Sequence, residues 1–230
     1  YNTNRKRINS IYAFANMDYK GVYFLDITGR NDWSSALIYE NGTGNTSYFY
    51  PSVGASWLFV EGLREHMPEF ISFGKLRASY AIVGNDCAQY LTPGKSYYAL
   101  ETTFDTPPEN APFKTLKPEK TNSLEVGFDG TFFQNRLDVN LTYYKTNTKN
   151  QILGLPIASE SGVGKRWINA GDIQNKGIEL LITGTPIETK DWRWDLSFNL
   201  TRNTNKIVSL FEGVDKYQLL GGGTDTQGWA

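Results

Sequence analysis

The chain has 230 residues with 23 basic and 24 acidic side chains, a balance that gives no electrostatic basis for nucleic-acid binding. The single cysteine, Cys87, excludes an internal disulfide and a cysteine-rich zinc site. No run of about 18 apolar residues occurs, which excludes a transmembrane helix. The polar start YNTNRKRINS does not resemble a signal peptide, so we expect an internal piece or a processed product.

Taken in chain order, the sequence predicts eight β-strands. Their ranges are 9–18, 22–30, 48–59, 73–83, 121–133, 136–147, 173–185 and 189–203. Most reach about ten residues, whereas ordinary strands average about five or six. Strands that cross a bilayer at a tilt need about 9–11 residues, so these lengths favour a membrane barrel.

Two hairpins have a predicted register. A three-residue turn at 19–21 would oppose Met17 to Tyr23 and place Gly21 at positive φ. A two-residue turn at 134–135 would oppose apolar residues to apolar residues along the whole fifth and sixth strands. The predicted pairs there are Phe132 with Leu137, Gly130 with Val139, Phe128 with Leu141, and Val126 with Tyr143.

The connections are also patterned along the chain. Those at 19–21, 134–135 and 186–188 are short, and 60–72 is intermediate and suits one helical turn. Long connections occupy 31–47, 84–120, 149–172 and the chain after 204. Short turns on one side and long loops on the other are typical of an outer-membrane barrel.

The predicted strands separate a polar face from an apolar one. The charged residues that we expect to line a water-filled lumen are Glu125, Asp129, Asp138, Glu179, Arg193 and Asp195. We expect no charge on the apolar face, because a basic residue facing mid-bilayer lipid costs about 2–4 kcal/mol. Aromatic residues near the strand ends suit a membrane interface, namely Tyr23, Phe49, Trp57, Phe59, Phe132, Trp192 and Trp194.

Several long blocks resemble the SusC/RagA family of TonB-dependent outer-membrane transporters of Bacteroidota. They are GRNDWSSAL (29–37), YFYPSVGASWLF (48–59), FGKLRASYAIVGN (73–85), LKPEKTNSLEVGFDGTFFQNRL (116–137), TYYKTNTKNQIL (142–153) and INAGDIQNKGIELLITGTPI (168–187). The resemblance implies a barrel of about 22 strands with a plugged lumen. It also implies a SusD-like surface lipoprotein as a lid and energy from the TonB complex.

The expected fold is therefore an all-β, antiparallel transmembrane barrel, of which residues 1–230 form a C-terminal-type wall segment without a plug domain. A soluble, carbohydrate-binding β-sandwich is the alternative, because such sandwiches also alternate polar and apolar residues. Strand length, the placement of the aromatics and the confinement of charge count against it.

Residues that could support catalysis are few. His66 has no histidine or cysteine beside it, and Cys87 has no neighbouring base, so we predict no enzyme, metal or cofactor. Glu125 and Asp129 lie four residues apart on one strand face, about 13 Å, which is too far for a glycosidase pair. The ligand-binding candidates are aromatics that we place in long loops, namely Trp33, Tyr97, Tyr98, Phe104 and Trp167.

The expected function is uptake of oligosaccharides across the outer membrane, with peptides as the alternative cargo. The expected partners are the SusD-like lipoprotein, the TonB complex and membrane lipid. A surface barrel or adhesin that transports nothing is the alternative from another class.

Overall fold

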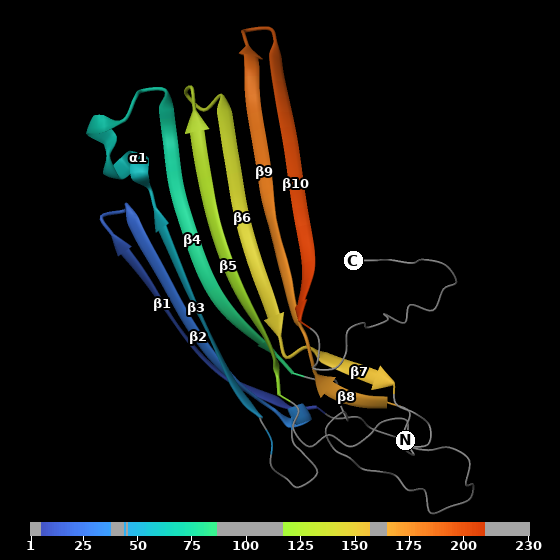
Figure 1. Ribbon diagram of the computed structural model, residues 1–230. Coiled ribbons are helices and arrows are strands. Elements are labelled where there is room, and N and C mark those ends of the chain that lie inside the picture. The colour runs from blue at the N-terminus through green and yellow to red at the C-terminus, as the bar shows by residue number, and fades with distance from the viewer. Residues whose placement is uncertain (1–5, 38–43, 45, 87–116, 157–164, 210–230) are drawn as a thin grey trace, which may run out of the picture.

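The structure is a computed structural model that describes residues 6–37, 44, 46–86, 117–156 and 165–209. In this part of the chain, eight strands form one antiparallel sheet in the order β1-β2-β3-β4-β5-β6-β9-β10 (Figure 1). β7 and β8 form a separate two-stranded sheet. β1 and β10 lie at the two edges of the large sheet and do not pair with each other there. None of the described helices is long and apolar enough to cross a membrane.

Each predicted range falls on one strand of the large sheet. The strands are β1 (Ile8–Tyr19), β2 (Tyr23–Ser34), β3 (Ser47–Trp57), β4 (Ile71–Asn85), β5 (Glu119–Phe132), β6 (Leu137–Lys149), β9 (Asp172–Glu188) and β10 (Arg193–Ser209). They contain between 11 and 17 residues, so the predicted long strands are confirmed. The remaining elements are η1 (Ser35–Leu37), α1 (Phe59–Gly62), η2 (Arg64–His66), β7 (Ile152–Pro156) and β8 (Lys165–Asn169).

The first hairpin differs from the prediction by two residues. Its loop spans 20–22, so Met17 lies opposite Leu25 and Tyr19 lies opposite Tyr23. The turn is fixed locally, because the Gly21 amide donates to Asp18 Oδ1 at 2.7 Å and the Val22 amide donates to the Tyr19 carbonyl at 3.2 Å. A shift of two residues keeps every side chain on its predicted face. The positive φ of Gly21, 62°, is confirmed.

The register of the β5–β6 hairpin is as predicted, but its loop is longer. Phe132 lies opposite Leu137, and the loop spans 133–136 instead of two residues. Phe133 leaves the ladder because its amide donates to the Phe70 carbonyl at 2.7 Å and its ring stacks on Phe70 at 5.7 Å. Adding one residue on each side of a turn leaves the pairing unchanged, which is why the register is still correct.

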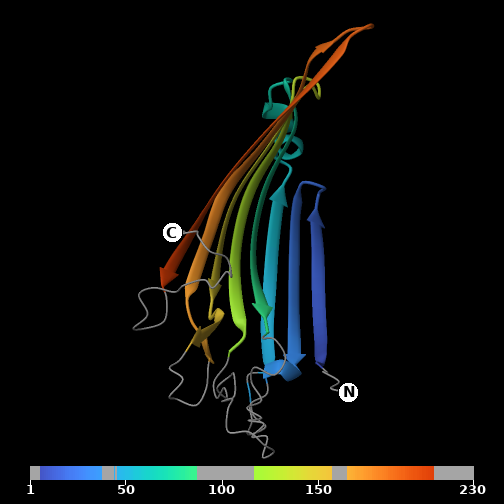
Figure 2. The same cartoon turned by 90° about the vertical axis from the view of Figure 1, so that its right-hand side faces the viewer.

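The predicted turn at 186–188 is wrong. β9 continues to Glu188, and the turn spans 189–192. The Thr189 amide donates to the Trp192 carbonyl at 2.7 Å, and the Trp192 amide donates to Thr189 Oγ1 at 3.0 Å. Pro186 lies inside β9 next to a register shift between Trp194 and Leu196, and such irregularities tolerate proline. The β9–β10 hairpin therefore projects beyond the other turns (Figures 1 and 2).

The hairpin turns and the helical connection that join neighbouring strands of the large sheet lie at one end of it, which we call the turn end. They are 20–22, 58–70, 133–136 and 189–192, and α1 and η2 form the expected helical turn in 58–70. The opposite end, the loop end, carries η1, β7 and β8 (Figure 1). The predicted separation of short and long connections is therefore confirmed.

The two faces of the large sheet differ in chemistry. The apolar face carries Leu124, Val126 and Phe128 of β5 beside Leu141 and Tyr143 of β6. Many of its large side chains are exposed, including Val126 at 44% and Leu200 at 51%. The polar face carries the alternating residues between them. An exposed apolar surface of this length needs a nonpolar medium, which supports the membrane assignment over the soluble sandwich.

Aromatic rings mark the apolar face at the turn end. The ring centroids form a continuous series of contacts at 6.0 to 6.3 Å that links Tyr19, Tyr23, Trp57, Phe59 and Phe128. Phe59 reaches this series by crossing Gly74, where an added Cβ would lie 2.2 Å from the ring. Aromatic belts of this kind anchor barrels at the membrane interface.

The prediction that the apolar face carries no charge is wrong at the loop end. The register places Lys145, Lys176 and Arg202 on this face, one step beyond its last apolar residues. These strands extend further than the apolar band, so their residues at the loop end leave the hydrocarbon and can be charged.

Candidate functional site

The charged residues that the sequence predicted for a lumen share the polar face of the large sheet, where they form two separate groups. Strand pairing places Thr142 between Gly127 and Glu179, and places Asp138 beside Thr131. Asp138 accepts a hydrogen bond from Thr131 Oγ1 at 2.8 Å. Side chains that alternate with the apolar face must point to its opposite side.

Arg77 of β4 forms the centre of this face. Its guanidinium contacts Glu125 Oε1 at 2.5 Å and Asp129 Oδ2 at 3.4 Å. It also donates to Thr142 Oγ1 at 2.6 Å, so one side chain connects β4, β5 and β6. Asn140 Nδ2 donates to the same Asp129 carboxylate. We call Arg77, Glu125, Asp129, Asn140 and Thr142 the wall cluster.

A glycine makes the wall cluster possible. Arg77 lies directly opposite Gly127, and a Cβ at Gly127 would lie 2.4 Å from Arg77 Nε. The missing side chain lets the guanidinium lie flat across β5, between the two acidic residues at positions 125 and 129. Arg77 was not among the predicted site residues. Its position opposite Gly127 depends on the β4–β5 register, which cannot be predicted across a connection as long as 84–120.

Arg193 and Asp195 lie apart from the wall cluster. They bond to each other near the turn end, with Arg193 Nε 3.0 Å from Asp195 Oδ2. Thr185 Oγ1 donates to Asp195 at 2.6 Å, and Arg193 Nη1 lies 3.5 Å from Glu188. The three charged side chains are exposed, so the pairs contribute little to stability.

A second polar group lies near the loop end on β2 and β3. Arg30 Nε donates to Asp32 Oδ1 at 2.8 Å, and Arg30 Nη2 donates to Ser10 Oγ at 3.0 Å. The Tyr50 hydroxyl donates to the other oxygen of Asp32. Asp32 is only 5% exposed, and this pairing satisfies the buried carboxylate. Beside it, Asp86 accepts from Ser34 Oγ and lies 2.6 Å from Lys6 Nζ.

The β7–β8 hairpin lies within the connection predicted as loop 149–172. Ile152, Trp167 and Ile168 pack against Leu37, which is fully buried. The carboxylate of Glu119 accepts from the Ile152 amide at 2.8 Å, and Asn169 exchanges hydrogen bonds with the Lys117 backbone at 2.7 Å. The hairpin is thus fixed to the ends of β2 and β5.

Two of the five aromatic residues predicted to bind a ligand, Trp33 and Trp167, lie in the described part of the chain. Trp33 lies in β2, not in a loop, and points to the apolar face because Asp32 and Ser34 take the polar one. Trp167 lies in β8 and packs on the Leu37 cluster. Tyr97, Tyr98 and Phe104 lie outside the described residues, as does Cys87. His66 lies in η2 at the turn end.

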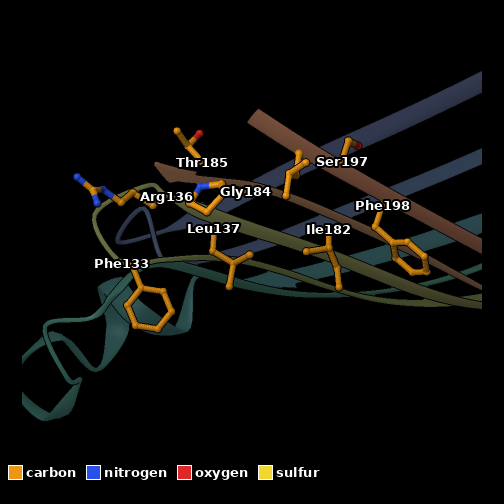
Figure 3. Close-up of a pocket in the computed structure, with 10 residues that line it drawn as sticks. Phe133, Arg136, Leu137, Ile182, Gly184, Thr185, Ser197 and Phe198 are labelled. Atoms are coloured by element: carbon orange, nitrogen blue, oxygen red, sulfur yellow. The ribbon is translucent and has the colours of Figure 1, made fainter. Parts of the chain in front are cut away.

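A groove of about 610 Å³ lies at the turn end over β9 (Figure 3). Gly184 forms its floor, since this glycine separates the side chains of Leu137 and Leu196. Ile182 and Phe198 extend the groove along the apolar face. Hydrocarbon suits such a groove better than a polar nutrient, so we do not assign cargo to it.

Comparison with known proteins decides the family. A family model described as "TonB dependent receptor-like, beta-barrel" matches residues 1–228. The chain belongs to the TonB-dependent receptor family. Receptors of this family are outer-membrane β-barrels, and the chain is therefore a segment of a barrel wall in that membrane.

Three relatives show where this receptor segment falls within the family. It is 31% identical to TonB-dependent receptor P3 of Formosa agariphila over 221 residues, covering 93% of this chain and 22% of that protein. It is 28% identical to TonB-dependent receptor SusC of Bacteroides thetaiotaomicron, covering 92% of this chain and 22% of SusC. The solved RagAB peptide transporter matches with a TM-score of 0.78 and 26% identity, covering 94% of this chain and 24% of that one.

These matches confirm the resemblance to the SusC/RagA group. The chain spans about a fifth of the length of the curated relatives, because 22% of each is covered. Those relatives are named as receptors, not as enzymes.

Proposed function

We propose that this chain is part of the wall of a receptor that imports oligosaccharides through the outer membrane. In this proposal the polar face lines the passage and the apolar face contacts lipid. The connections at the loop end face the exterior, as is usual for outer-membrane barrels. The chain carries no catalytic role in this proposal and leaves its cargo chemically unchanged.

The observation that carries the proposal is the internal pairing of charge on the polar face. Arg77 contacts two carboxylates in the wall cluster, and Arg193 contacts two more near the turn end. Paired charges present a weaker field to the passage than isolated ones. A wall of this kind stays wet without selecting strongly charged cargo.

The rest of the polar face offers neutral hydrogen-bonding groups. Hydroxyl pairs bridge neighbouring strands, with Thr28 and Ser52 at 2.5 Å and Thr121 and Thr148 at 2.9 Å. Hydroxyls both donate and accept, as the hydroxyls of a sugar do. Neutral oligosaccharides are therefore the cargo that this chemistry fits best.

Peptides are the second candidate cargo. The solved structure with a TM-score of 0.78 is named as a peptide transporter, and it shares 26% identity with this chain. A neutral, hydrated wall also admits peptide backbones, whose amides and carbonyls make the same kinds of hydrogen bond.

The proposed partners are a SusD-like surface lipoprotein at the loop end and the TonB complex on the opposite side of the membrane. The similarity to the solved RagAB peptide transporter supports a partner of this kind. Affinity purification of the tagged receptor should recover a SusD-like lipoprotein in near-equal amount. Purification of the receptor alone under mild detergent conditions would contradict the partnership.

Growth tests examine the transport proposal. A deletion strain should lose growth on one or a few purified oligosaccharides and keep growth on the corresponding monosaccharides. The intact gene should restore growth, whereas a gene without its TonB-binding segment should not. A growth defect on peptides with normal growth on every glycan would contradict oligosaccharide import and identify peptides as the cargo. Full restoration without the TonB-binding segment would contradict active transport.

A further inference from the structure

Basic residues follow the apolar band directly on three neighbouring strands. On β6 the last apolar residue is Tyr143 and the next position on the same face is Lys145. On β9 Ile178 is followed in the same way by Lys176, and on β10 Leu200 is followed by Arg202. We call Lys145, Lys176, Arg202 and the neighbouring Lys206 the basic patch.

The geometry of the patch is electrostatically unfavourable by itself. Lys145 and Lys176 lie directly opposite each other in the β6–β9 ladder. Like charges in directly opposed positions destabilise a sheet. Within the described residues, none of the four basic side chains forms an ion pair with a carboxylate. An anion from outside the chain would remove this repulsion.

The nearest acidic residue on this face is already engaged. Asp172 lies opposite Lys149 at the end of β9, and its Oδ1 accepts from Asn147 Nδ2 at 3.0 Å. Lys120 and Lys149, which pair with each other two same-face steps beyond Lys145, add positive charge. The local excess of positive charge favours a ligand with negative charge.

The level of the patch across the bilayer indicates which negatively charged ligand could reach it. Leu137 and Lys145 are separated by roughly 27 Å along the strand at about 3.4 Å per residue. A tilt of about 40° reduces this to roughly 21 Å across the bilayer. The apolar band of such barrels is about 25 Å tall, so the lysine head reaches the level of the lipid headgroups.

The patch is local and not a general property of the loop end. On β1 to β4 the corresponding positions past the apolar residues are neutral, for example Asn9 on β1 and Ser47 on β3. At the turn end, the same face carries aromatic rings in place of basic residues. Among the described residues, β6, β9 and β10 carry a basic residue at the first same-face position past the apolar band, whereas β5 has Asn122 there and Lys120 one step beyond it.

We propose that the basic patch binds the phosphate groups of anionic lipids in the leaflet that surrounds the loop end. The acyl chains would lie against Tyr143, Ile178 and Leu200, and the phosphate would lie between Lys145, Lys176 and Arg202. This ligand satisfies both the apolar surface and the unpaired charges. The site faces lipid, so it is distinct from the passage and independent of the cargo.

Lipid titration of the intact receptor tests the proposal. The receptor in a neutral detergent is titrated with phosphatidic acid or with phosphatidylcholine, and bound lipid is counted by native mass spectrometry. The wild type should bind phosphatidic acid more tightly. The double variant Lys145→Gln/Lys176→Gln should bind it roughly 30-fold more weakly, because each basic residue near a charged lipid surface contributes about fivefold. The matched control Lys20→Gln/Lys190→Gln, at the turn end, should bind as the wild type does.

Four results of the binding experiment would overturn the proposal. They are unchanged binding by the Lys145/Lys176 variant, an equal loss in the turn-end control, equal affinity for the two lipids, and full displacement of phosphatidic acid by inorganic phosphate. Thermal unfolding without lipid checks the fold, and Lys176→Gln should be at least as stable as the wild type because it removes a repulsion. A lower unfolding temperature would mean that protein contacts hold the lysine, and would also contradict lipid binding.

Discussion

Arg77 makes three polar contacts from one strand to the next two, and Gly127 provides the space for them. We expect Gly127→Ala to destabilise the receptor by about 1–3 kcal/mol, the usual cost of forcing an extra methyl into a packed position. The new Cβ would lie 2.4 Å from Arg77 Nε and would push the guanidinium away from its carboxylates. Urea unfolding of the receptor in lipid bilayers measures the change.

Gly54→Ala is the matched control for this substitution. Gly54 also lies on the polar face of a strand, but an added Cβ there would be 3.9 Å from Asp26 and Ser79, which is ordinary contact. Equal free energies of unfolding for the two variants would show that Arg77 can move without destabilising the receptor. The wall cluster would then have no stabilising role.

Val139 and Asn140 are neighbours that face opposite sides of β6. Val139 lies between Gly130 and Ile182 on the apolar face, whereas Asn140 bonds to Asp129 on the polar face. Val139→Arg should cost about 2–4 kcal/mol by facing lipid with a charge. Asn140→Arg should cost far less, because its guanidinium can pair with Asp129. Folded yield in refolding lipid measures both, and equal losses would reverse or abolish the assigned faces.

At the scale of elements, periodicity predicted more than turn chemistry did. Two-residue alternation located the eight strands of the large sheet and assigned their faces, since a polar residue on the wrong face is costly over a whole strand. The hairpin loops were less well predicted. The Asp18 bond to Gly21 shifts the first register by two residues, and the Phe70–Phe133 contact widens the loop at 133–136.

The β7–β8 hairpin was not predicted, and its stability comes from distant contacts. Its strands have five residues each, too few for a clear period. It depends on Leu37, which lies more than a hundred residues earlier in the chain. No local pattern in ILGLP or KRWIN indicates that partner.

Substitution of Trp167 tests whether the β7–β8 hairpin contacts cargo or only packs against Leu37. Leu37→Ala should loosen the hairpin by about 2–5 kcal/mol, as expected for a buried leucine. If Trp167 only packs, Trp167→Ala and Leu37→Ala should reduce uptake to similar, moderate extents. If Trp167 also stacks on sugar rings, Trp167→Ala should weaken cargo binding further, whereas Trp167→Phe should restore it. Isothermal titration with the transported oligosaccharide separates these results.

At the scale of the whole molecule, the two ends of the sheet predict its orientation in the membrane. Thr46 lies at the loop end and Asn135 at the turn end. In a receptor without Cys87, an impermeant thiol reagent should label a cysteine at position 46 on intact cells and leave position 135 unlabelled. Labelling of position 135 alone would reverse the orientation.

The candidate site was harder to predict than the fold. Acidic residues such as Glu125 and Asp129 were recognisable from alternation within a single strand. Their cation, Arg77, required the pairing of β4 with β5 across the connection 84–120, which no local pattern fixes. Lys145 and Arg202 each follow the apolar residues of their own strand, so alternation alone places them beside the apolar band. That these cations lie together on neighbouring strands becomes visible only once β6, β9 and β10 are aligned.

We infer that one face of this sheet meets lipid and that the other meets water inside a barrel. Spin labels at successive positions from 137 to 143 in β6 test it directly in the assembled receptor. Labels at odd-numbered positions should collide with lipid-soluble oxygen, and labels at even-numbered positions should collide with a water-soluble nickel complex. A uniform response along the strand, or oxygen contact at the even-numbered positions, would contradict it.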